Sequence, residues 1–562
     1  MLISFLSVLF LSNSYIPFAT SLLQGSISRA LQKKKSYTTQ SQTSLIPLFD
    51  DANPDLVGVH VDGYPLPTIP CRPDDNELME RLQSIPGDDL FTKLPEEEQL
   101  NLAGGRTLTA TRPLRILVAG GGLGGLAAAS ALLRKGYDVH VLEQAVQYKP
   151  FGGPIQLQSN ALWALQQISP ELYEAVQECG VQTGDRLSGI KDGLRYKEGW
   201  LVKFDAATPA RKKGLPLTLA INRVVLQEIF LKYGVPPERI HTDARVVSYN
   251  NTAKGHGVAV TLENGNTVYG DILVGADGIW SRVRHQMCGL PNDEVGIRYA
   301  TKHASYSGYT CFTGTCQHTP EDIETVAYKV FLGQEQYLGC TDAGHGWQHW
   351  WAFLPDAPTL SSIATNTDSD GKRKLERLKR EFAGWSPEIH DLFQATKPEV
   401  IRQRDLFDRK PMWDGWTDKS GANVVLLGGA YRFSFVIGKR PGILFFFSCQ
   451  YLSSLTFSLT DACHPTMPNL GQGGAMAIED AYVMAEELDG IQHTDEIPKR
   501  IKDYVKRRFV RASIAQFLSR NGSDLLVDWE KLRQTPVVGP LAMASINLFQ
   551  PIFMDYLYSA DL

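Results

Sequence analysis

The chain has 562 residues, of which 43% are hydrophobic and 21% charged, and its formal net charge is -5. This length exceeds one small core, so we expect two closely joined regions with terminal extensions. The charge balance lacks the basic excess that attracts nucleic acid, so no nucleic-acid partner is expected. The eight cysteines are scattered without the close pairs that a metal site needs, and we predict no metal centre.

The first 112 residues differ in composition from the rest. Residues 1–20 begin with an apolar stretch of signal-peptide length, and residues 21–49 carry Ser, Thr, Arg and Lys but no acidic residue. Together they resemble the two-part leader of plastid proteins, with a disordered tail as the alternative. Residues 50–112 are rich in Asp, Glu and Pro, which predicts a solvated extension or linker.

The folded part is predicted to begin after Pro113 with a strand, a helix and a second strand. Leu114 to Val118 is a short apolar run typical of a buried strand. Leu126 to Leu133 has helical spacing, and Tyr137 to Leu142 has the composition of the next strand. The order predicts a βαβ unit.

A glycine cluster lies between that first strand and the helix. It has the pattern Gly120-x-Gly122-x-x-Gly125, and Glu143 ends the second strand. Glycine permits the tight turn and lets a pyrophosphate approach the backbone N–H groups at the helix N-terminus, while Glu143 can accept hydrogen bonds from a ribose. The pattern predicts a dinucleotide site, with a ligand-free glycine loop as the alternative.

Further along, the pattern becomes that of antiparallel sheet. Val258 to Leu262 alternates apolar with polar or small residues up to Asn264-Gly265, which predicts a hairpin returning through Val268 to Ile272. Residues 300–355 are rich in aromatic and β-branched residues and predict a second, mostly antiparallel sheet.

A second motif follows an apolar strand at residues 275–284, which read GADGIWSRVR. It resembles the GADGxxSxVR signature of flavoprotein hydroxylases. The resemblance implies that Asp277 and Gly278 contact the ribityl or pyrophosphate part of FAD. An ordinary turn is the alternative for Asp277-Gly278 alone.

A third motif covers residues 461–474, which read DACHPTMPNLGQGG and resemble the GD-x6-P stretch of the same hydroxylases. The resemblance implies that Asp461 holds the ribityl chain and that Pro468 turns the backbone. A helix over 475–487 is then expected, opened by Gly471, Gly473 and Gly474, with its positive N-terminal end toward the flavin.

Two shorter stretches add to the resemblance. Arg223 lies in an Asn-Arg-x-x-Leu sequence that resembles the start of a helix beside the flavin, with a surface charge as the alternative. Residues 153–160, which include Gln156 and Gln158, resemble the strand that runs near the isoalloxazine ring in epoxidases.

Residues 306–314 and 322–326 resemble the substrate-side sheet of zeaxanthin epoxidases, and the resemblance runs from about residue 113 to about 520. It implies an α/β fold in which a Rossmann-like FAD-binding domain is interleaved with a mostly antiparallel substrate-domain sheet, followed by C-terminal helices. The substrate-lining candidates are Gln156, Gln158, Tyr306, Tyr309, Phe312 and Trp350.

The implied activity is an FAD-dependent monooxygenase that epoxidises the ring double bond of a hydroxylated carotenoid through a flavin C4a-hydroperoxide. The chemistry is carried by the flavin, so no catalytic side chain is expected. The co-substrates are O2 and an electron donor, either NAD(P)H or reduced ferredoxin. The alternatives are a hydroxylase of another apolar or aromatic ring and an inactive FAD-binding paralogue.

Residues 429–460 interrupt the third motif, because the family places Gly428 directly before Asp461. We interpret this segment as a retained intron. The predicted regions are therefore an FAD-binding region at 113–300 with 424–428 and 461–490, a substrate-domain sheet at 301–410 and a helical region at 491–562. Residues 537–557 are apolar and could give peripheral contact with a plastid membrane.

Overall fold

The computed structural model describes residues 60–61, 64–70, 75–84, 90, 113–148, 153–252, 257–289, 305–356, 368–408, 416–418, 423–428, 472–491, 493–527 and 555–556. Every described residue belongs to one compact unit, Pro47–Leu562. Three features lie outside the described residues: the two leader segments, the insert at 429–460, and Asp461, Pro468 and Gly471 of the third motif.

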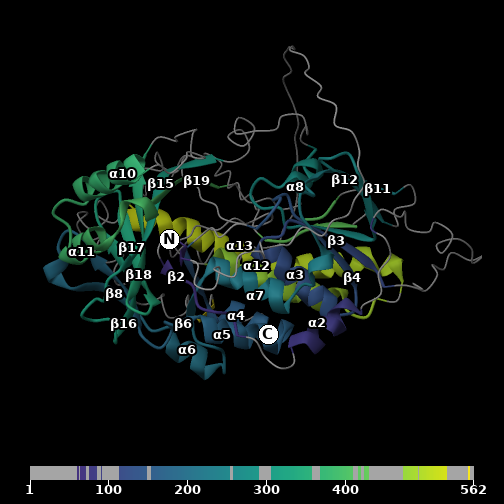
Figure 1. Cartoon of the computed structure of the whole chain (residues 1–562), viewed down its shortest axis with the longest axis horizontal. Coiled ribbons are helices and arrows are strands. Elements are labelled where there is room, and N and C mark those ends of the chain that lie inside the picture. Colours follow the sequence, from purple (N-terminus) through teal and green to yellow (C-terminus); the bar gives the residue numbers. More distant parts are fainter. Residues whose placement is uncertain are drawn as a thin grey trace, which may run out of the picture. The chain divides into compact units, whose positions relative to one another are not determined.

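Five parallel strands form the centre of one region, in the order β10-β4-β3-β14-β20. Figure 1 labels β3 and β4 of this sheet. They are β3 (Arg115–Ala119), β4 (Asp138–Leu142), β10 (Ile240–His241), β14 (Ile272–Gly275) and β20 (Val424–Leu426). Every residue of β3, β4, β14 and β20 is buried, which explains why β14, β20 and β3 after Arg115 are apolar runs; β4 buries Asp138 and His140 as well. The predicted βαβ unit is confirmed.

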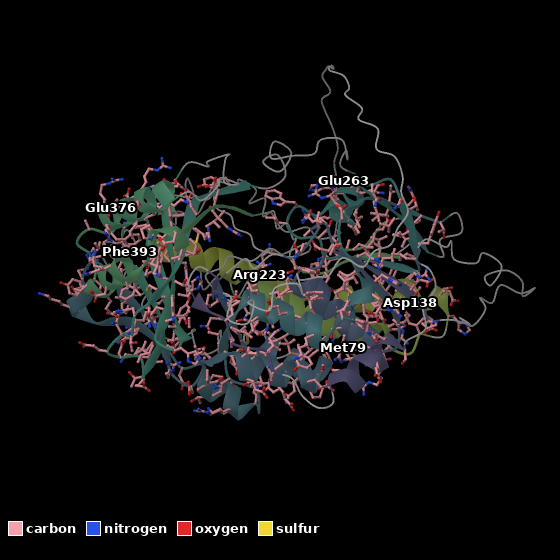
Figure 2. All side chains as sticks on the ribbon, in the orientation of Figure 1. Met79, Asp138, Arg223, Glu263, Glu376 and Phe393 are labelled. Atoms are coloured by element: carbon pink, nitrogen blue, oxygen red, sulfur yellow. The ribbon has the colours of Figure 1, made fainter. Side chains whose placement is uncertain are left out.

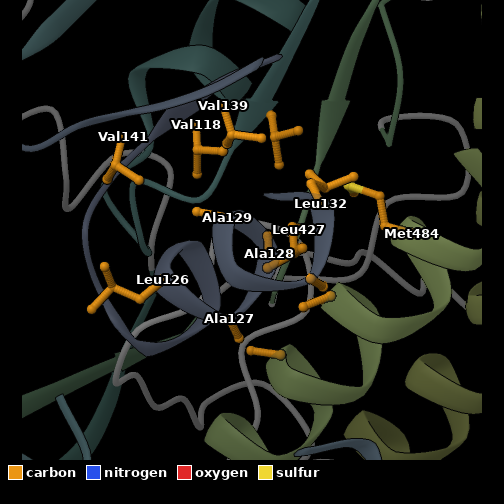
Figure 3. Close-up of a cluster of buried hydrophobic side chains, with 14 of the residues drawn as sticks. Val118, Leu126, Ala127, Ala128, Ala129, Leu132, Val139, Val141, Leu427 and Met484 are labelled. Atoms are coloured by element: carbon orange, nitrogen blue, oxygen red, sulfur yellow. The ribbon is translucent and has the colours of Figure 1, made fainter. Parts of the chain in front are cut away.

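Helices pack around this sheet. They are α3 (Leu123–Arg134), α4 (Ser159–Ile168), α5 (Pro170–Cys179), α7 (Arg223–Tyr233), α12 (Gln472–Leu488) and α13 (Ile497–Val527). Figure 3 shows the alanines of α3 in the same apolar cluster as Val118 and Val139 of the sheet, Leu427 after β20, and Met484 of α12. Short side chains on α3 let both the sheet and α12 approach closely.

A mixed sheet of seven strands forms a second region, in the order β19-β15-β18-β17-β16-β7-β8. Its strands are β7 (Leu187–Asp192), β8 (Trp200–Phe204), β15 (Ser305–Gln317), β16 (Val326–Leu332), β17 (Tyr337–Gly344), β18 (Trp347–Pro355) and β19 (Arg402–Asp408). All neighbouring pairs are antiparallel except β16 and β7. The expected antiparallel character is confirmed, but β7 and β8 come from within the predicted first region, 113–300.

One face of this sheet is covered by α10 (Asp368–Glu381) and α11 (Pro387–Ala395), which Figure 1 shows beside β15 and β17. Because side chains alternate along a strand, every second residue contributes to the core under these helices. That core contains Phe312, Phe331 and Trp350 from the sheet and Phe393 from α11. The opposite face of the sheet carries a different set of side chains.

Smaller elements complete the described chain. Strands β5 (Pro154–Leu157), β9 (Leu219–Asn222) and β6 (Val181–Gln182) form an antiparallel sheet that contacts β17. Strands β11 (Val246–Asn251), β12 (Val258–Leu262) and β13 (Thr267–Gly270) form another. The remaining α-helices and β-strands are β1 (His60–Val61), β2 (Tyr64–Pro65), α2 (Asp75–Gln83), α6 (Ala207–Lys212) and α8 (Arg282–Met287). Leu78 and Leu82 of α2 are buried in the hydrophobic core, so the prediction of a solvated extension over 50–112 is wrong for this helix.

The predicted hairpin is confirmed as β12 and β13, with Gly265 at a φ of +87° in the turn. Its end was placed too late, because Ile272 pairs with Ile116 of β3 and belongs to the parallel sheet. The chain passes from one sheet to the other at Asp271, which the apolar pattern of the sequence did not reveal.

Candidate functional site

The first glycine motif forms the turn between β3 and α3. Gly120 has a φ of +106°, and a Cβ there would lie 2.5 Å from the carbonyl oxygen of Ala276. A Cβ on Gly125 would lie 1.9 Å from the Gly120 oxygen. Both glycines are therefore required by the fold itself. Gly122 differs, because its Cβ would meet nothing within 4 Å, so open space borders the N-terminus of α3 at this point.

Glu143 holds this turn from the end of β4. Its carboxylate accepts hydrogen bonds from the backbone nitrogens of Gly121, at 2.6 Å, and Ala145, at 2.8 Å. Two further residues touch the turn. A Cβ on Gly121 would lie 2.0 Å from the Tyr148 hydroxyl, and Gln227 Nε2 donates to the Gly121 oxygen at 3.3 Å.

Neither Tyr148 nor Gln227 is among the residues predicted from the sequence. Gln227 lies one helical turn after Arg223 on α7, and this i, i+4 spacing is the signal that could have found it. Tyr148 follows the second strand after an irregular stretch, where spacing gives no comparable signal.

The second motif meets the first. Asp277 Oδ2 accepts from the backbone nitrogens of Arg282, at 2.7 Å, and Val283, at 3.3 Å, which fixes the carboxylate at the start of α8. Its other oxygen, Oδ1, is buried without a hydrogen-bond partner. Burial raises the pKa of Asp277, against hydrogen bonds from the α8 turn that lower it. Gly278 follows with a φ of +79°, a conformation that favours glycine.

The described part of the third motif is the N-terminal turn of α12. Gly473 and Gly474 lie in this turn, and a Cβ on Gly474 would meet nothing within 4 Å. The helix also approaches the first motif, since a Cβ on Gly124 would lie 3.1 Å from the Ala477 Cβ. The described parts of the three motifs therefore come together, although they are more than 100 residues apart in sequence.

Arg223 begins α7, as predicted, and Figure 2 labels it between the two sheet regions. Asn222 caps the helix by accepting from the Val224 nitrogen at 2.9 Å. The Arg223 nitrogen donates to the Gly153 oxygen at 3.4 Å, which joins α7 to the start of β5. This part of the chain connects the parallel sheet to the seven-stranded sheet.

The two predicted glutamines lie on and after β5. Gln156 Nε2 donates to Thr341 Oγ1 of β17 at 2.7 Å, and its oxygen accepts from Thr183 Oγ1 at 2.9 Å. Gln158 is buried at the N-terminus of α4. Gln156 therefore joins the strand beside the glycine motifs to the seven-stranded sheet.

The four aromatic candidates on the seven-stranded sheet separate between its two faces. Tyr309 packs with Phe353 on the face away from α10 and α11. Tyr306 donates or accepts a hydrogen bond with Thr310 Oγ1 at 3.3 Å, and burial raises the pKa of Tyr306 to about 12.

Phe312 and Trp350 lie on the helix-covered face, and both are completely buried. Trp350 Nε1 donates to Thr396 Oγ1 at 2.9 Å, and its ring meets Phe393 edge-on at 5.3 Å. This packing is that of core side chains, so we remove both residues from the substrate-lining set. The error arose because aromatic content alone does not reveal which face of a strand a residue occupies.

A buried charge cluster joins α12 to α13. Arg508 donates to Asp480 at 2.7 Å and to Glu479 at 2.5 Å, and Arg511 also bonds Glu479. Burial would raise the pKa of Glu479, but the two arginines hold that pKa below its ordinary value. Asp480 also accepts from the Gly428 nitrogen at 3.1 Å, so this cluster fixes the end of β20 against α12.

One surface groove of about 290 Å³ lies elsewhere, along α13. None of the motif residues lines it; its residues are Thr417, Lys502, Val505, Lys506, Phe509 and Val510. Within the described ranges, no group of three or more His, Cys, Asp or Glu side chains is arranged to hold a metal ion. Among the helices that the structure describes, none combines the length and apolarity needed to cross a bilayer.

The chain is similar to plant proteins named chloroplastic zeaxanthin epoxidase. It is 36% identical to the one from Prunus armeniaca over 85% of this chain and 65% of that protein. It is 39% identical to the one from Arabidopsis thaliana, over 71% of this chain and 53% of that protein. The chain thus spans between about half and two thirds of the length of these relatives. No protein-family model matches it.

Two solved structures share the fold of this chain. HpxO from Klebsiella pneumoniae, complexed with FAD and uric acid, matches 80% of this chain and 97% of its own, with a TM-score of 0.60 and 21% identity. A salicylate hydroxylase substrate complex matches 79% of this chain and 95% of its own, with a TM-score of 0.57 and 21% identity. At these identities the match establishes the fold.

Proposed function

We infer from these similarities that the chain belongs to the zeaxanthin epoxidase family, and we propose that it is an FAD-dependent monooxygenase that epoxidises the ring double bond of a hydroxylated carotenoid. The observation that carries the proposal is the meeting of the first two motifs with the α12 N-terminus, beside a seven-stranded sheet that bears an aromatic face.

The residues around this meeting point fit the pyrophosphate and ribityl parts of FAD. Open space borders Gly122 and Gly474 at the N-termini of α3 and α12, where backbone N–H groups favour negative charge. Asp277 Oδ1 is buried without a hydrogen-bond partner, and a ribityl hydroxyl could satisfy it. Glu143 already holds the first turn, so we assign it mainly to positioning that turn.

When bound and reduced, FAD would supply the activation of O2 and the oxygen atom that the ring alkene receives. The protein must hold the ring in place and exclude water. Gln156, Gln158, Tyr306 and Tyr309 remain our proposed substrate-lining residues. None is required to act as an acid, base or nucleophile. Either NAD(P)H or reduced ferredoxin could serve as the electron donor.

We also propose a plastid location with peripheral membrane contact, because the relatives are named chloroplastic and a carotenoid substrate partitions into membranes. The segment proposed for that contact, residues 537–557, lies almost entirely outside the described residues. Ferredoxin is a possible protein partner if it serves as the donor.

The test is to express the full chain, record its flavin absorbance, and follow zeaxanthin with each electron donor in turn. We expect bound FAD and formation of the mono-epoxide and di-epoxide. If no carotenoid is epoxidised but another ring compound accelerates NAD(P)H oxidation by the protein, the alternative of a hydroxylase is favoured. Bound FAD with no accelerating substrate would favour an inactive paralogue.

A glycine pair tests the cofactor site. Gly122→Ala adds a Cβ into open space at an allowed φ of -76°, so we expect the free energy of unfolding to fall by no more than about 1 kcal/mol while FAD affinity drops at least about tenfold. Gly120→Ala is the matched control, because its Cβ overlaps Ala276 and should cost roughly 1–3 kcal/mol of stability. Unchanged FAD affinity in Gly122→Ala would contradict the proposed site.

A chain lacking residues 429–460 should be compared in the same assays. If only the shorter form binds FAD, the segment is incompatible with the flavin site, as the intron hypothesis predicts. Equal FAD binding by both forms would remove the structural support for that hypothesis.

A further inference from the structure

Three polar side chains form a row across the face of the seven-stranded sheet that is opposite α10 and α11. His349 of β18 pairs with Thr315 of β15 on one side and with Thr341 of β17 on the other. In antiparallel sheets, the Cβ atoms of directly opposed residues lie ~4.5–5.5 Å apart. The three side chains are therefore neighbours on one face.

Two members of this row have hydrogen-bonding capacity that the protein leaves unused. His349 is 8% exposed and Thr315 is 7% exposed, yet His349 Nδ1 and Thr315 Oγ1 are buried without a partner. Thr341, in contrast, donates to the Ala327 oxygen at 3.1 Å and accepts from Gln156 at 2.7 Å. Leaving a buried polar atom unpaired costs about 1–3 kcal/mol, so such atoms call for an explanation.

The chemistry of the unused groups matches an alcohol. Burial lowers the pKa of His349 to about 4, so its imidazole is neutral at physiological pH and offers one N–H donor and one nitrogen acceptor. The Thr315 hydroxyl can also donate or accept. An alcohol oxygen has the same dual capacity, and it could bond both side chains across the strand pair. An ionised carboxylate only accepts hydrogen bonds, so it would match the donors and acceptors of these two side chains less well than an alcohol does.

The surroundings of the row are aromatic. The Trp351 ring lies 5.4 Å from the His349 ring, and the Tyr328 ring lies 5.6 Å from that of Trp351. Both aromatic residues are only partly buried. The face therefore places a polar end beside an apolar surface, which suits a hydrocarbon ring that carries a hydroxyl group.

The row also lies next to the region assigned to the cofactor. A Cβ on Gly153 would lie 2.7 Å from His349 Nε2, so glycine at this position leaves room for the imidazole. Gly153 immediately precedes β5, and its carbonyl oxygen accepts from Arg223 at the start of α7. His349 thus lies where the substrate-side sheet meets the strand beside the glycine motifs.

We propose that Thr315 and His349 form a hydrogen-bonding subsite for the hydroxyl group of the substrate ring, with Trp351 packing against the apolar part of that ring. This rests on the proposed function, and it assigns the preference for a hydroxylated over an unhydroxylated carotenoid to two side chains. His349 acts here by binding the substrate and exchanges no proton with it.

The test measures binding and epoxidation of zeaxanthin and of β-carotene, which lacks the ring hydroxyls, by the full chain in detergent micelles. Dissociation constants come from quenching of tryptophan fluorescence. The variants are Thr315→Val, which keeps the shape but loses the hydroxyl, Thr315→Ser, which keeps the hydroxyl, and His349→Phe. Thr325→Val, in an exposed turn directly before β16 of the same sheet, is the unrelated control.

We expect the unmodified chain and Thr325→Val to bind zeaxanthin at least about tenfold more tightly than β-carotene. Thr315→Val and His349→Phe should each reduce this ratio by about five- to tenfold, and Thr315→Ser should retain most of it. A ratio that is unchanged in both Thr315→Val and His349→Phe would overturn the subsite, as would an equal loss of affinity for both carotenoids.

The binding and epoxidation measurements separate this inference from the proposed function. If zeaxanthin binds preferentially and Thr315→Val removes that preference, while no epoxide forms with either donor, the subsite stands and the proposed reaction fails. If epoxide forms but Thr315→Val and His349→Phe leave the zeaxanthin preference intact, the reaction stands and the subsite fails.

Discussion

Between α12 and α13, the buried polar groups are ionised and paired, whereas on the seven-stranded sheet the neutral Thr315 hydroxyl and Nδ1 of the neutral His349 have no hydrogen-bond partner. Glu479 and Arg508 have no exposed side-chain surface, yet each bonds at least two groups of opposite charge or complementary polarity. The cost of removing these charges from water is thus offset by direct partners.

The difference separates two uses of buried polarity. A paired cluster holds elements together, and here it fixes α13 and the end of β20 against α12, whose N-terminus belongs to the third motif. An unpaired group weakens the fold and gains its partner only from a ligand. Polar burial by itself therefore does not point to a ligand, whereas a buried polar group without a partner leaves hydrogen-bonding capacity that a ligand can use.

Breaking the paired cluster should have the largest effect. Arg508→Met leaves Glu479 and Asp480 buried without their main counter-charge, which we expect to lower the free energy of unfolding by about 3–5 kcal/mol. The measurement is urea-induced unfolding followed by circular dichroism. The neighbouring Arg507→Met is the matched control, because the Arg507 side chain is 32% exposed and its pair with Glu487 should contribute at most about 1 kcal/mol.

Equal losses of the free energy of unfolding in the two variants would mean that the α12–α13 charges behave like surface pairs. The contrast between these paired charges and the unpaired polar groups of the seven-stranded sheet would then disappear. A loss confined to Arg508→Met would also be expected to weaken FAD binding, since α12 would no longer be fixed against β20.

A change of pH should distinguish the neutral His349 from the ionised cluster between α12 and α13. The expected change in the free energy of unfolding is smaller than that for Arg508→Met. Burial lowers the pKa of His349 to about 4, and burial together with the charges of His140 and Arg239 lowers that of His241 to about 4, both from 6.5. Between about pH 6.5 and pH 4 the unfolded chain binds protons that the folded chain does not. The free energy of unfolding is therefore full above pH 6.5 and falls as the pH is lowered, by up to about 3 kcal/mol per histidine.

Glu479 affects the pH dependence only near and below about pH 4.5, because its pKa in the folded chain lies below the ordinary value of 4.5, at which the unfolded chain takes up its proton. Unfolding midpoints measured from pH 7.5 to pH 4.5 should fall less steeply in His349→Phe than in the unmodified chain. Identical slopes would show that His349 gains a partner or solvent in the folded protein.

The sequence predicted the parallel region well because β3, β14 and β20 are mostly apolar runs and because its glycines have backbone requirements. Gly120, with its positive φ and its contact with Ala276, is a residue whose type reveals its geometry. The seven-stranded sheet was harder, since both of its faces are buried and aromatic. The sequence could not tell that Trp350 faces α11 while Trp351 faces the other way, nor that β7 and β8 join this sheet.

His349 was missed for a related reason. A single histidine in a strand gives no signal in sequence, and its partners Thr315 and Thr341 lie on strands whose pairing follows only from the fold. Gln156 was found because it belongs to a recognisable motif, but its bond to Thr341 could not be predicted.

The smallest effect is expected at Thr315, whose hydroxyl has no hydrogen-bond partner. It is measured in the absence of carotenoid. Thr315 Oγ1 has no hydrogen bond to lose, so Thr315→Val should leave the free energy of unfolding unchanged or raise it by up to about 1 kcal/mol. Thr341→Val removes bonds to the Ala327 oxygen and to Gln156 and should cost about 1–3 kcal/mol. The two threonines flank the same histidine and are both buried, so urea unfolding of this pair compares a hydroxyl without a partner with one that is hydrogen-bonded. If Thr315→Val loses as much stability as Thr341→Val, the Thr315 hydroxyl is already satisfied within the protein, and neither the contrast nor the subsite can rest on it.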